Sequence, residues 1–165
     1  MRTLKVKEIT LDSFNQYGKF ANMINPIMCK IGEEPVEFFR DMLQLSFGQS
    51  KTGSFSTCRV LKRPLIIDNI EFHTFAGEGV LPLDGDILLS VAPATANGDV
   101  PDDRIEVFKV PKGTMVTIYP GVWHGAPFAC VSECVNVLIV LSERVYANDC
   151  SVVKFSEEKR IAIDK

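Results

Sequence analysis

The stretch that decides the fold is residues 70–85, IEFHTFAGEGVLPLDG. Its first four residues alternate apolar and ionisable side chains, which is typical of a β-strand with one buried face. Because side chains at positions i and i+2 leave a strand on the same face, Glu71 and His73 are predicted to point the same way, about 6.6 Å apart along the strand. Glu78 follows within the same stretch. These polar side chains could therefore converge on one ion or ligand.

On both sides of this stretch, short apolar segments follow one another at close spacing. The segments predicted as strands after residue 37 are 38–47, 54–60, 66–74, 79–82, 87–93, 105–109, 115–119, 134–142 and 150–155. Gly, Pro and Asp separate them, and no helical pattern lies between them to build βαβ units. The sequence therefore predicts an all-β sandwich or barrel.

The rest of the chain is predicted to complete a single domain over residues 1–165, with the barrel at 38–155. Residues 1–37 are expected to form a strand, a short amphipathic helix with an N-cap candidate within residues 10–14, and an irregular excursion over the surface. Residues 156–165 are predicted to be a charged tail on the surface. A chain of 165 residues is long enough for one hydrophobic core and too short for two.

Composition argues against several classes of partner. The net charge is −3 and no dense basic patch is present, so neither nucleic acid nor an anionic membrane is expected. No apolar run approaches the roughly 20 residues that a membrane span needs, and no targeting segment is evident. The five cysteines are an odd number without a CxxC pair, which indicates reduced thiols in a cytoplasmic protein. A small molecule is the expected partner.

The chain has two histidines: His73 lies in the stretch 70–85, and His124 ends a second motif, residues 113–124. With Glu71 and Glu78 they would form a set of oxygen and nitrogen donors that suits Mn, Fe, Ni or Zn better than Cu(I). Three or four protein ligands would leave open positions for a substrate. The alternative is that the histidines are satisfied core groups and the glutamates lie in solvent. An unpaired carboxylate among apolar residues would be costly, however.

Two further residues are candidates for substrate binding. The guanidinium of Arg59 could clamp a substrate carboxylate with two hydrogen bonds, or it could pair with Glu71 or Asp68. Trp123 could contact the substrate, although packing beside the site is the simpler role for it. Asp149 and Cys150 are interpreted as structural, because no base flanks the thiol.

Two motifs resemble those of the cupin superfamily. Residues 70–85 resemble the first cupin motif, with Glu71 in place of the first histidine of its His-x-His pair, followed by His73, Glu78 and a turn glycine. Residues 113–124 resemble the second motif, which ends at the last metal ligand, here His124. The resemblance implies a cupin double-stranded β-helix, or jelly-roll barrel, with a short N-terminal helix.

A narrower resemblance, strongest over residues 54–155, is to the ureidoglycolate lyase family, a cupin branch that acts in the breakdown of purine-derived ureides. Matching pieces occur in the family's order: Phe14, Tyr17, Gly18, Arg59, 71–73, 81–85, 91–92, 121–124, 127–128 and 149–150. Two positions depart from the family. Gly125 stands where a second histidine is often found, and Glu78 stands where glutamine is usual, although metal-binding cupins have glutamate there.

The resemblance implies an enzyme that cleaves the C–N bond of a carbinolamide, giving the α-keto acid glyoxylate and urea. Such chemistry needs a base, an acid and an anchor for the substrate carboxylate. His124 or Glu78 is expected to be the base, and His73 is the third catalytic candidate. A divalent metal would be held by His73, Glu78, His124 and Glu71. A homodimer is also expected. The alternatives are a non-catalytic cupin that binds a small carboxylate or sugar, and a cupin sugar isomerase.

Overall fold

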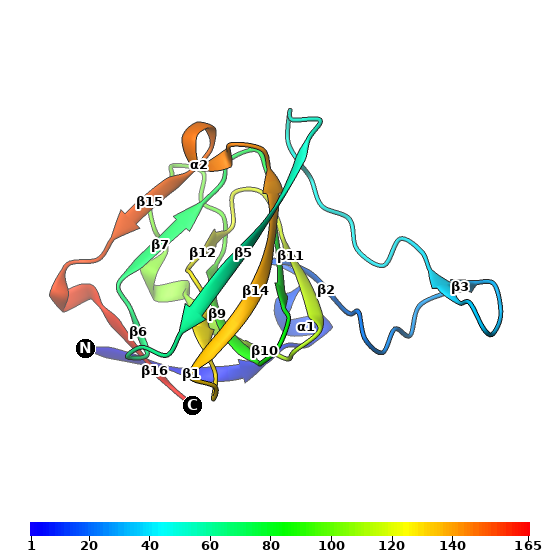
Figure 1. The fold of residues 1–165 in the computed structure, drawn as a ribbon. Helices are drawn as coiled ribbons and strands as arrows, with labels where there is room; N and C mark the ends of the chain where they lie inside the picture. Colours follow the sequence, from blue (N-terminus) through cyan, green and yellow to red (C-terminus); the bar gives the residue numbers. More distant parts are fainter.

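Two curled β-sheets face one another in the computed structural model, which describes all 165 residues (Figure 1). The larger sheet follows the order β15 (Ser151–Lys154), β7 (Asn69–Phe72), β12 (Trp123–His124), β9 (Ile87–Ala92), β10 (Glu106–Val110), β1 (Arg2–Glu8), β16 (Ile161–Asp164) and β6 (Ile66–Ile67), with β13 (Phe128–Ala129) also paired to β9. The smaller sheet follows the order β2 (Gly18–Asn22), β11 (Thr114–Ile118), β8 (Glu78–Pro82), β14 (Cys134–Ser142) and β5 (Gly53–Leu61). The predicted all-β barrel is confirmed.

The helices are short and lie at the ends of the barrel. They are α1 (Leu11–Phe14) and α2 (Val145–Asn148), with single 3₁₀ turns at Asp102–Arg104 and Glu157–Lys159. The predicted cap of α1 is confirmed: the Thr10 side chain accepts from the Ser13 backbone N–H, and the Ser13 side chain accepts from the Thr10 N–H. This capping box satisfies two donors that the first helical turn would otherwise leave unpaired. None of the helices has the length and apolarity that a membrane crossing requires.

Alternation along β9 shows how the core is divided. All six of its residues are buried. Leu89 and Val91 belong to the core between the two sheets, whereas Leu88 and Ala92 belong to a second core on the opposite face of the larger sheet. Successive side chains of a strand point to opposite faces, so one strand contributes to both cores. The larger sheet is therefore covered on both sides at this point.

Both chain ends contribute strands to the barrel, which corrects two predicted boundaries. The interpretation of 156–165 as a surface tail was wrong, because β16 lies in the larger sheet with Ile161 and Ile163 buried. It pairs in parallel with β1, which in turn pairs in parallel with β10. The barrel therefore extends beyond residues 38–155 at both ends.

The chain between β2 and β5 leaves the barrel, as expected for part of 1–37. It carries the two-stranded hairpin of β3 (Lys30–Ile31) and β4 (Phe38–Phe39), which projects well away from the sheets (Figure 1). The predicted strand 38–47 was wrong beyond Phe39, since residues 40–52 form no strand. The excursion also begins later than expected, because residues 18–22 form β2 against β11.

Candidate functional site

The strand pair β7–β12 brings together residues distant in sequence. His124 lies directly opposite Glu71 in the antiparallel register, so the two side chains share a face that points into the barrel. Their neighbours Phe72 and Trp123 take the opposite face, where the rings pack with centroids 4.4 Å apart. A turn centred on Gly121, whose φ of 80° favours glycine, leads the chain into β12. The register and the turn together place the His124 ring beside Glu71, on the face that points into the barrel.

Glu78 is the point on which the two histidines converge. It is the first residue of β8 in the facing sheet and is 7% exposed. Its Oε2 lies 3.1 Å from His73 Nε2 and 3.1 Å from His124 Nε2. Glu71 Oε1 lies 3.9 Å from His124 Nε2. One ligand atom from each of the four residues falls within 4.8 Å of every other, so the structure assembles the predicted cluster.

The second nitrogen of each ring fixes which nitrogen faces the cluster. His124 Nδ1 donates to the backbone carbonyl of Val122 at 3.0 Å, and His73 Nδ1 donates to the carbonyl of Asp149 at 2.7 Å. Since a carbonyl oxygen only accepts, each Nδ1 carries a hydrogen, and a neutral ring then presents the lone pair of Nε2. This is the form in which histidine binds metals, with the other nitrogen bonded to a carbonyl.

The electrostatics of the cluster favour a positive charge inside it. Burial penalises the Glu78 carboxylate, but the charge of His124 and the hydrogen bonds from both rings lower its pKa to about 2. Burial likewise opposes charge on His124, yet the Glu78 carboxylate raises its pKa above the usual value. A carboxylate held between two Nε2 atoms requires a cation beside it, either protons on the rings or a metal ion.

The four residues fit a divalent transition metal. Two ligands at right angles on an ion at about 2.1 Å lie roughly 3 Å apart, close to the separations of Glu78 from each ring. The mixed nitrogen and carboxylate donors suit Mn, Fe, Ni or Zn. His73, His124 and Glu78 are almost completely buried, and the Glu71 side chain is the most exposed of the four. The cluster therefore opens to solvent on the side of Glu71.

Comparison with known proteins agrees with this geometry. The family model described as Ureidoglycolate lyase matches residues 1–162. The chain belongs to the ureidoglycolate lyase family. A protein named ureidoglycolate lyase from Pseudomonas aeruginosa (strain LESB58) is 25% identical over 169 residues, covering 99% of this chain and 97% of its own. One from Rhodobacter capsulatus is 27% identical over 127 residues, 76% of this chain and 78% of its own.

Among solved structures, a dTDP sugar isomerase from Desulfovibrio desulfuricans G20 superimposes with a TM-score of 0.52. The match covers 86% of this chain and 87% of that one at 16% identity. At this identity the likeness shows the fold alone, and it supports the predicted cupin barrel. It says nothing of a shared substrate.

The structure does not bring Arg59, a residue that carries part of the family resemblance, to the cluster. Arg59 is exposed on β5, whereas its neighbours Cys58 and Val60 pack toward the core between the sheets. Its cross-strand partner on β14 is Asn136, which bonds Asp84 on the outer side of the smaller sheet. Since cross-strand partners share a face, the Arg59 side chain points away from the barrel interior.

Trp123 also points away from the cluster. Its ring is 1% exposed in the second core, and its Nε1–H donates to Thr95 Oγ1 at 3.2 Å. The simpler packing role considered for it agrees with this position. Of the predicted substrate-binding residues, only Glu71 lies at the cluster.

Three residues near the cluster were not predicted to serve it. The Cys150 thiol donates to Glu71 Oε2 at 3.6 Å. Tyr146, on α2, has its pKa raised to about 12 by partial burial and then by the charges of Glu78 and Glu71. Asp149 contacts the His73 ring through its backbone carbonyl, a group that every residue carries. Sequence alone gives no signal for such a contact.

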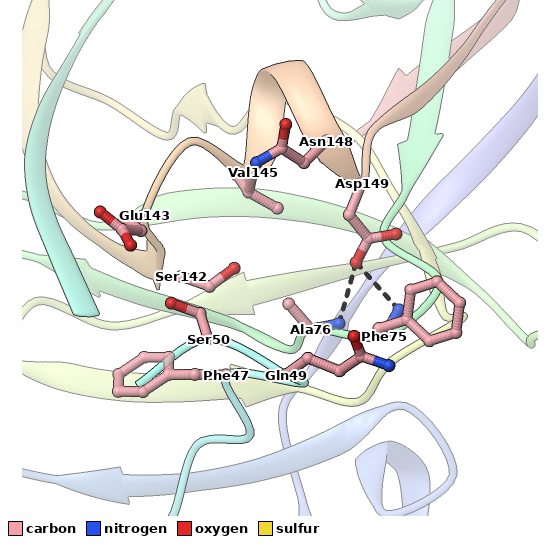
Figure 2. Close-up of a pocket in the computed structure, with 10 residues that line it drawn as sticks. All are labelled: Phe47, Gln49, Ser50, Phe75, Ala76, Ser142, Glu143, Val145, Asn148 and Asp149. Carbon is pink, nitrogen blue, oxygen red and sulfur yellow. Dashed lines mark hydrogen bonds between the residues drawn. The ribbon is translucent and has the colours of Figure 1, made fainter. Parts of the chain in front are cut away.

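The structure also contains a cavity of about 410 Å³ (Figure 2). It is lined by Phe47, Gln49, Ser50, Phe75, Ala76, Ser142, Glu143, Val145, Asn148 and Asp149. None of the four cluster residues lines it. Asp149 lines this cavity and also bonds the His73 ring, so it connects the two places.

Proposed function

We propose that this protein cleaves the C–N bond of ureidoglycolate to give glyoxylate and urea, with a divalent transition metal held by His73, Glu78 and His124. The observation that carries the proposal is the convergence of both Nε2 atoms on Glu78 Oε2, in a chain whose family model is that of ureidoglycolate lyase. Both histidines of the chain are committed to this one cluster.

The charge balance of the cluster supports the metal. It contains two carboxylates, and the charges of the two histidines act on Glu78. A substrate that carries its own carboxylate would be repelled by such a site unless a cation were present. Arg59, the predicted anchor for a substrate carboxylate, lies on the outer face of β5 and does not supply that charge. A divalent ion would both balance the glutamates and polarise a substrate oxygen.

Glu71 is the residue best placed to move the proton. Glu78 Oε2 is engaged by both histidine rings and would hold the metal, which argues against Glu78 as the base, and the His124 Nε2 atom is engaged with Glu78. Glu71 is more exposed than the other three residues and faces the opening. It would take the proton of the substrate hydroxyl as the O–H electrons form the C=O bond. The C–N electrons leave with the nitrogen, which receives that proton from Glu71.

A metal determination followed by a urea-release assay with ureidoglycolate tests the proposal. We expect about one transition metal per chain and urea release that stops when a chelator removes it. Glu71→Gln should keep the metal and lose turnover, whereas Glu78→Gln should lose the metal. Glu133→Gln, at a side chain that is 82% exposed, is the matched control and should change neither.

Two other outcomes would favour different functions. Saturable binding of a small carboxylate without urea release, with or without added metal, would favour the non-catalytic binding cupin. Turnover of a nucleotide sugar in its place would favour the isomerase. Either result would overturn the lyase proposal.

We also propose a homodimer in the cytoplasm. The segment between β2 and β5 exposes large apolar side chains, including Ile27 at 97%, Val36 at 73% and Phe38 at 62%. The edge strand β5 exposes Phe55 at 72%. Apolar surface of this kind supports association between copies. All five cysteines are unpaired, which suits a reducing compartment. Sedimentation of the purified chain would test the dimer, and a monomer at micromolar concentration would contradict it.

A further inference from the structure

Asp149 makes a set of contacts that a surface carboxylate rarely makes. It follows α2, and its carboxylate accepts three consecutive backbone N–H groups. Oδ1 accepts from Thr74 at 2.7 Å, and Oδ2 accepts from Phe75 at 2.9 Å and Ala76 at 3.0 Å (Figure 2 shows the last two). Although partial burial opposes its charge, these three bonds lower the pKa of Asp149 below its usual value. The carboxylate thus holds the turn after His73 as a unit.

The turn held by Asp149 is the one that joins two of the cluster residues. Residues 74–77 connect His73, which directly follows β7, to Glu78, at the start of β8. The backbone carbonyl of Asp149 meanwhile accepts from His73 Nδ1 at 2.7 Å. One residue therefore contacts the ring of the first ligand and the backbone that leads to the second.

The two histidines differ in how their rings are held. His124 Nδ1 bonds the carbonyl of Val122, two residues away on the same segment, so its orientation is set locally. His73 Nδ1 bonds a carbonyl 76 positions away. That carbonyl stays in place only while residue 149 stays against the 74–76 turn. The carboxylate bonds keep it there.

We propose that Asp149 is a positioning residue: by clamping the 74–76 turn it keeps the Nδ1 hydrogen of His73 on a carbonyl and His73 Nε2 aimed at Glu78. Groups that orient a metal-binding histidine from outside typically change metal affinity by about 10–100-fold when they are altered. The same effect is expected here. The inference rests on the metal-site part of the proposed function and is independent of the substrate.

The chain is well suited to a direct test, because it has only two histidines and therefore two sets of imidazole nitrogen signals, one for each ring. We would label the ring nitrogens with ¹⁵N and compare the wild-type protein with Asp149→Asn. An amide can accept through one oxygen only and places N–H donors against backbone N–H groups. The His73 signals are expected to show loss of the fixed Nδ1–H tautomer while those of His124 stay unchanged. Binding of Mn²⁺ alone is expected to weaken about 10–100-fold.

Asp84→Asn is the matched control. The Asp84 carboxylate also accepts a backbone N–H, from Asn136 at 2.7 Å, and the Asn136 side-chain amide at 2.6 Å. It lies in the turn between β8 and β9, so its loss should leave both histidine signals and Mn²⁺ binding unchanged. If Asp149→Asn changes these readouts and Asp84→Asn does not, the effect belongs to the carboxylate beside His73 and not to the loss of a turn-capping carboxylate in general.

Every outcome decides the proposal. Unchanged His73 signals in a folded Asp149→Asn protein, or equal changes at His73 and His124, would overturn it. Unfolding of this mild variant would overturn it as well, because the carboxylate would then serve the fold as a whole. Asp149→Ala, which removes all three bonds, must shift His73 at least as far as Asp149→Asn. If wild-type protein bound no Mn²⁺, the ring signals would still decide the positioning role, and the metal proposal would fail separately. Neither readout uses ureidoglycolate.

Discussion

The two faces of the β7–β12 pair have opposite character although they are built from adjacent residues. On the inner face, Glu71 and His124 lie opposite each other and join Glu78 in a buried polar cluster. On the outer face, Phe72 and Trp123 pack in an apolar core. The strands, the register and the depth in the molecule are the same. Only the direction of the side chain differs.

This difference shows how a cupin barrel separates chemistry from stability. A carboxylate buried among apolar groups is costly, so the inner face is stable only because its charges satisfy one another. The outer face gains free energy from burying aromatic surface. Changes on the inner face should therefore abolish function in a protein that still folds, although with reduced stability, whereas changes on the outer face should lower stability and leave function in the folded protein. The following predictions test that separation.

The largest effect on function is expected from His124→Asn. Removing the ring takes away one of the three proposed metal ligands, so urea release should fall by more than the roughly 10–100-fold that loss of an outer partner of a ligand causes. Circular dichroism should show the wild-type spectrum. Turnover within a factor of a few of wild type would mean that the inner face is not the active site.

The largest effect on stability is expected from Trp123→Ala. Emptying this site, in which the ring is 1% exposed, should lower the free energy of unfolding by about 3–5 kcal/mol, as measured by urea denaturation. Phe55→Ala, at a ring that is 72% exposed on β5, should change it by less than about 0.5 kcal/mol. The Trp123 variant that remains folded should still release urea. If it were folded but inactive, the two faces would not be separable.

A smaller effect is expected from Arg59→Ala. Sequence analysis considered Arg59 either as a clamp on the substrate carboxylate or as an ion-pair partner of Glu71 or Asp68, whereas the structure points its side chain away from the interior. From the structure we expect stability to change by less than about 0.5 kcal/mol and KM for ureidoglycolate to stay at its wild-type value. A large rise in KM, with kcat unchanged, would restore the sequence-based role and show that substrate reaches the outer side of β5.

The smallest effect is expected from Asp84→Asn and depends on pH. Hydrogen bonds from Asn136 lower the pKa of Asp84, so its ionised form stabilises the folded chain. That contribution is complete above the ordinary aspartate pKa and is lost as the pH falls through the lowered value. The wild-type protein should therefore melt slightly above the variant at pH 7, and the two should converge toward pH 3. A difference that persisted at low pH would contradict this cause.

The sequence by itself determined the parts of this protein that depend on local alternation. The period of two in residues 70–73 placed Glu71 and His73 on one face, and the spacing of short strands predicted an all-β barrel. The segment 134–142 was predicted with the bounds that β14 has. Glu78 and His124 were also found from sequence, through the resemblance of residues 70–85 and 113–124 to the two cupin motifs.

Tertiary structure alone decided the rest, because it depends on pairing between distant segments. The register that sets His124 opposite Glu71, the parallel pairing of β1 with β16, and the outward direction of Arg59 are all set by packing across the sheets. The contact of His73 with the Asp149 carbonyl uses a backbone group that is the same in every residue. A repeating backbone carries no sequence signal, so only the folded chain shows which carbonyl meets which ring.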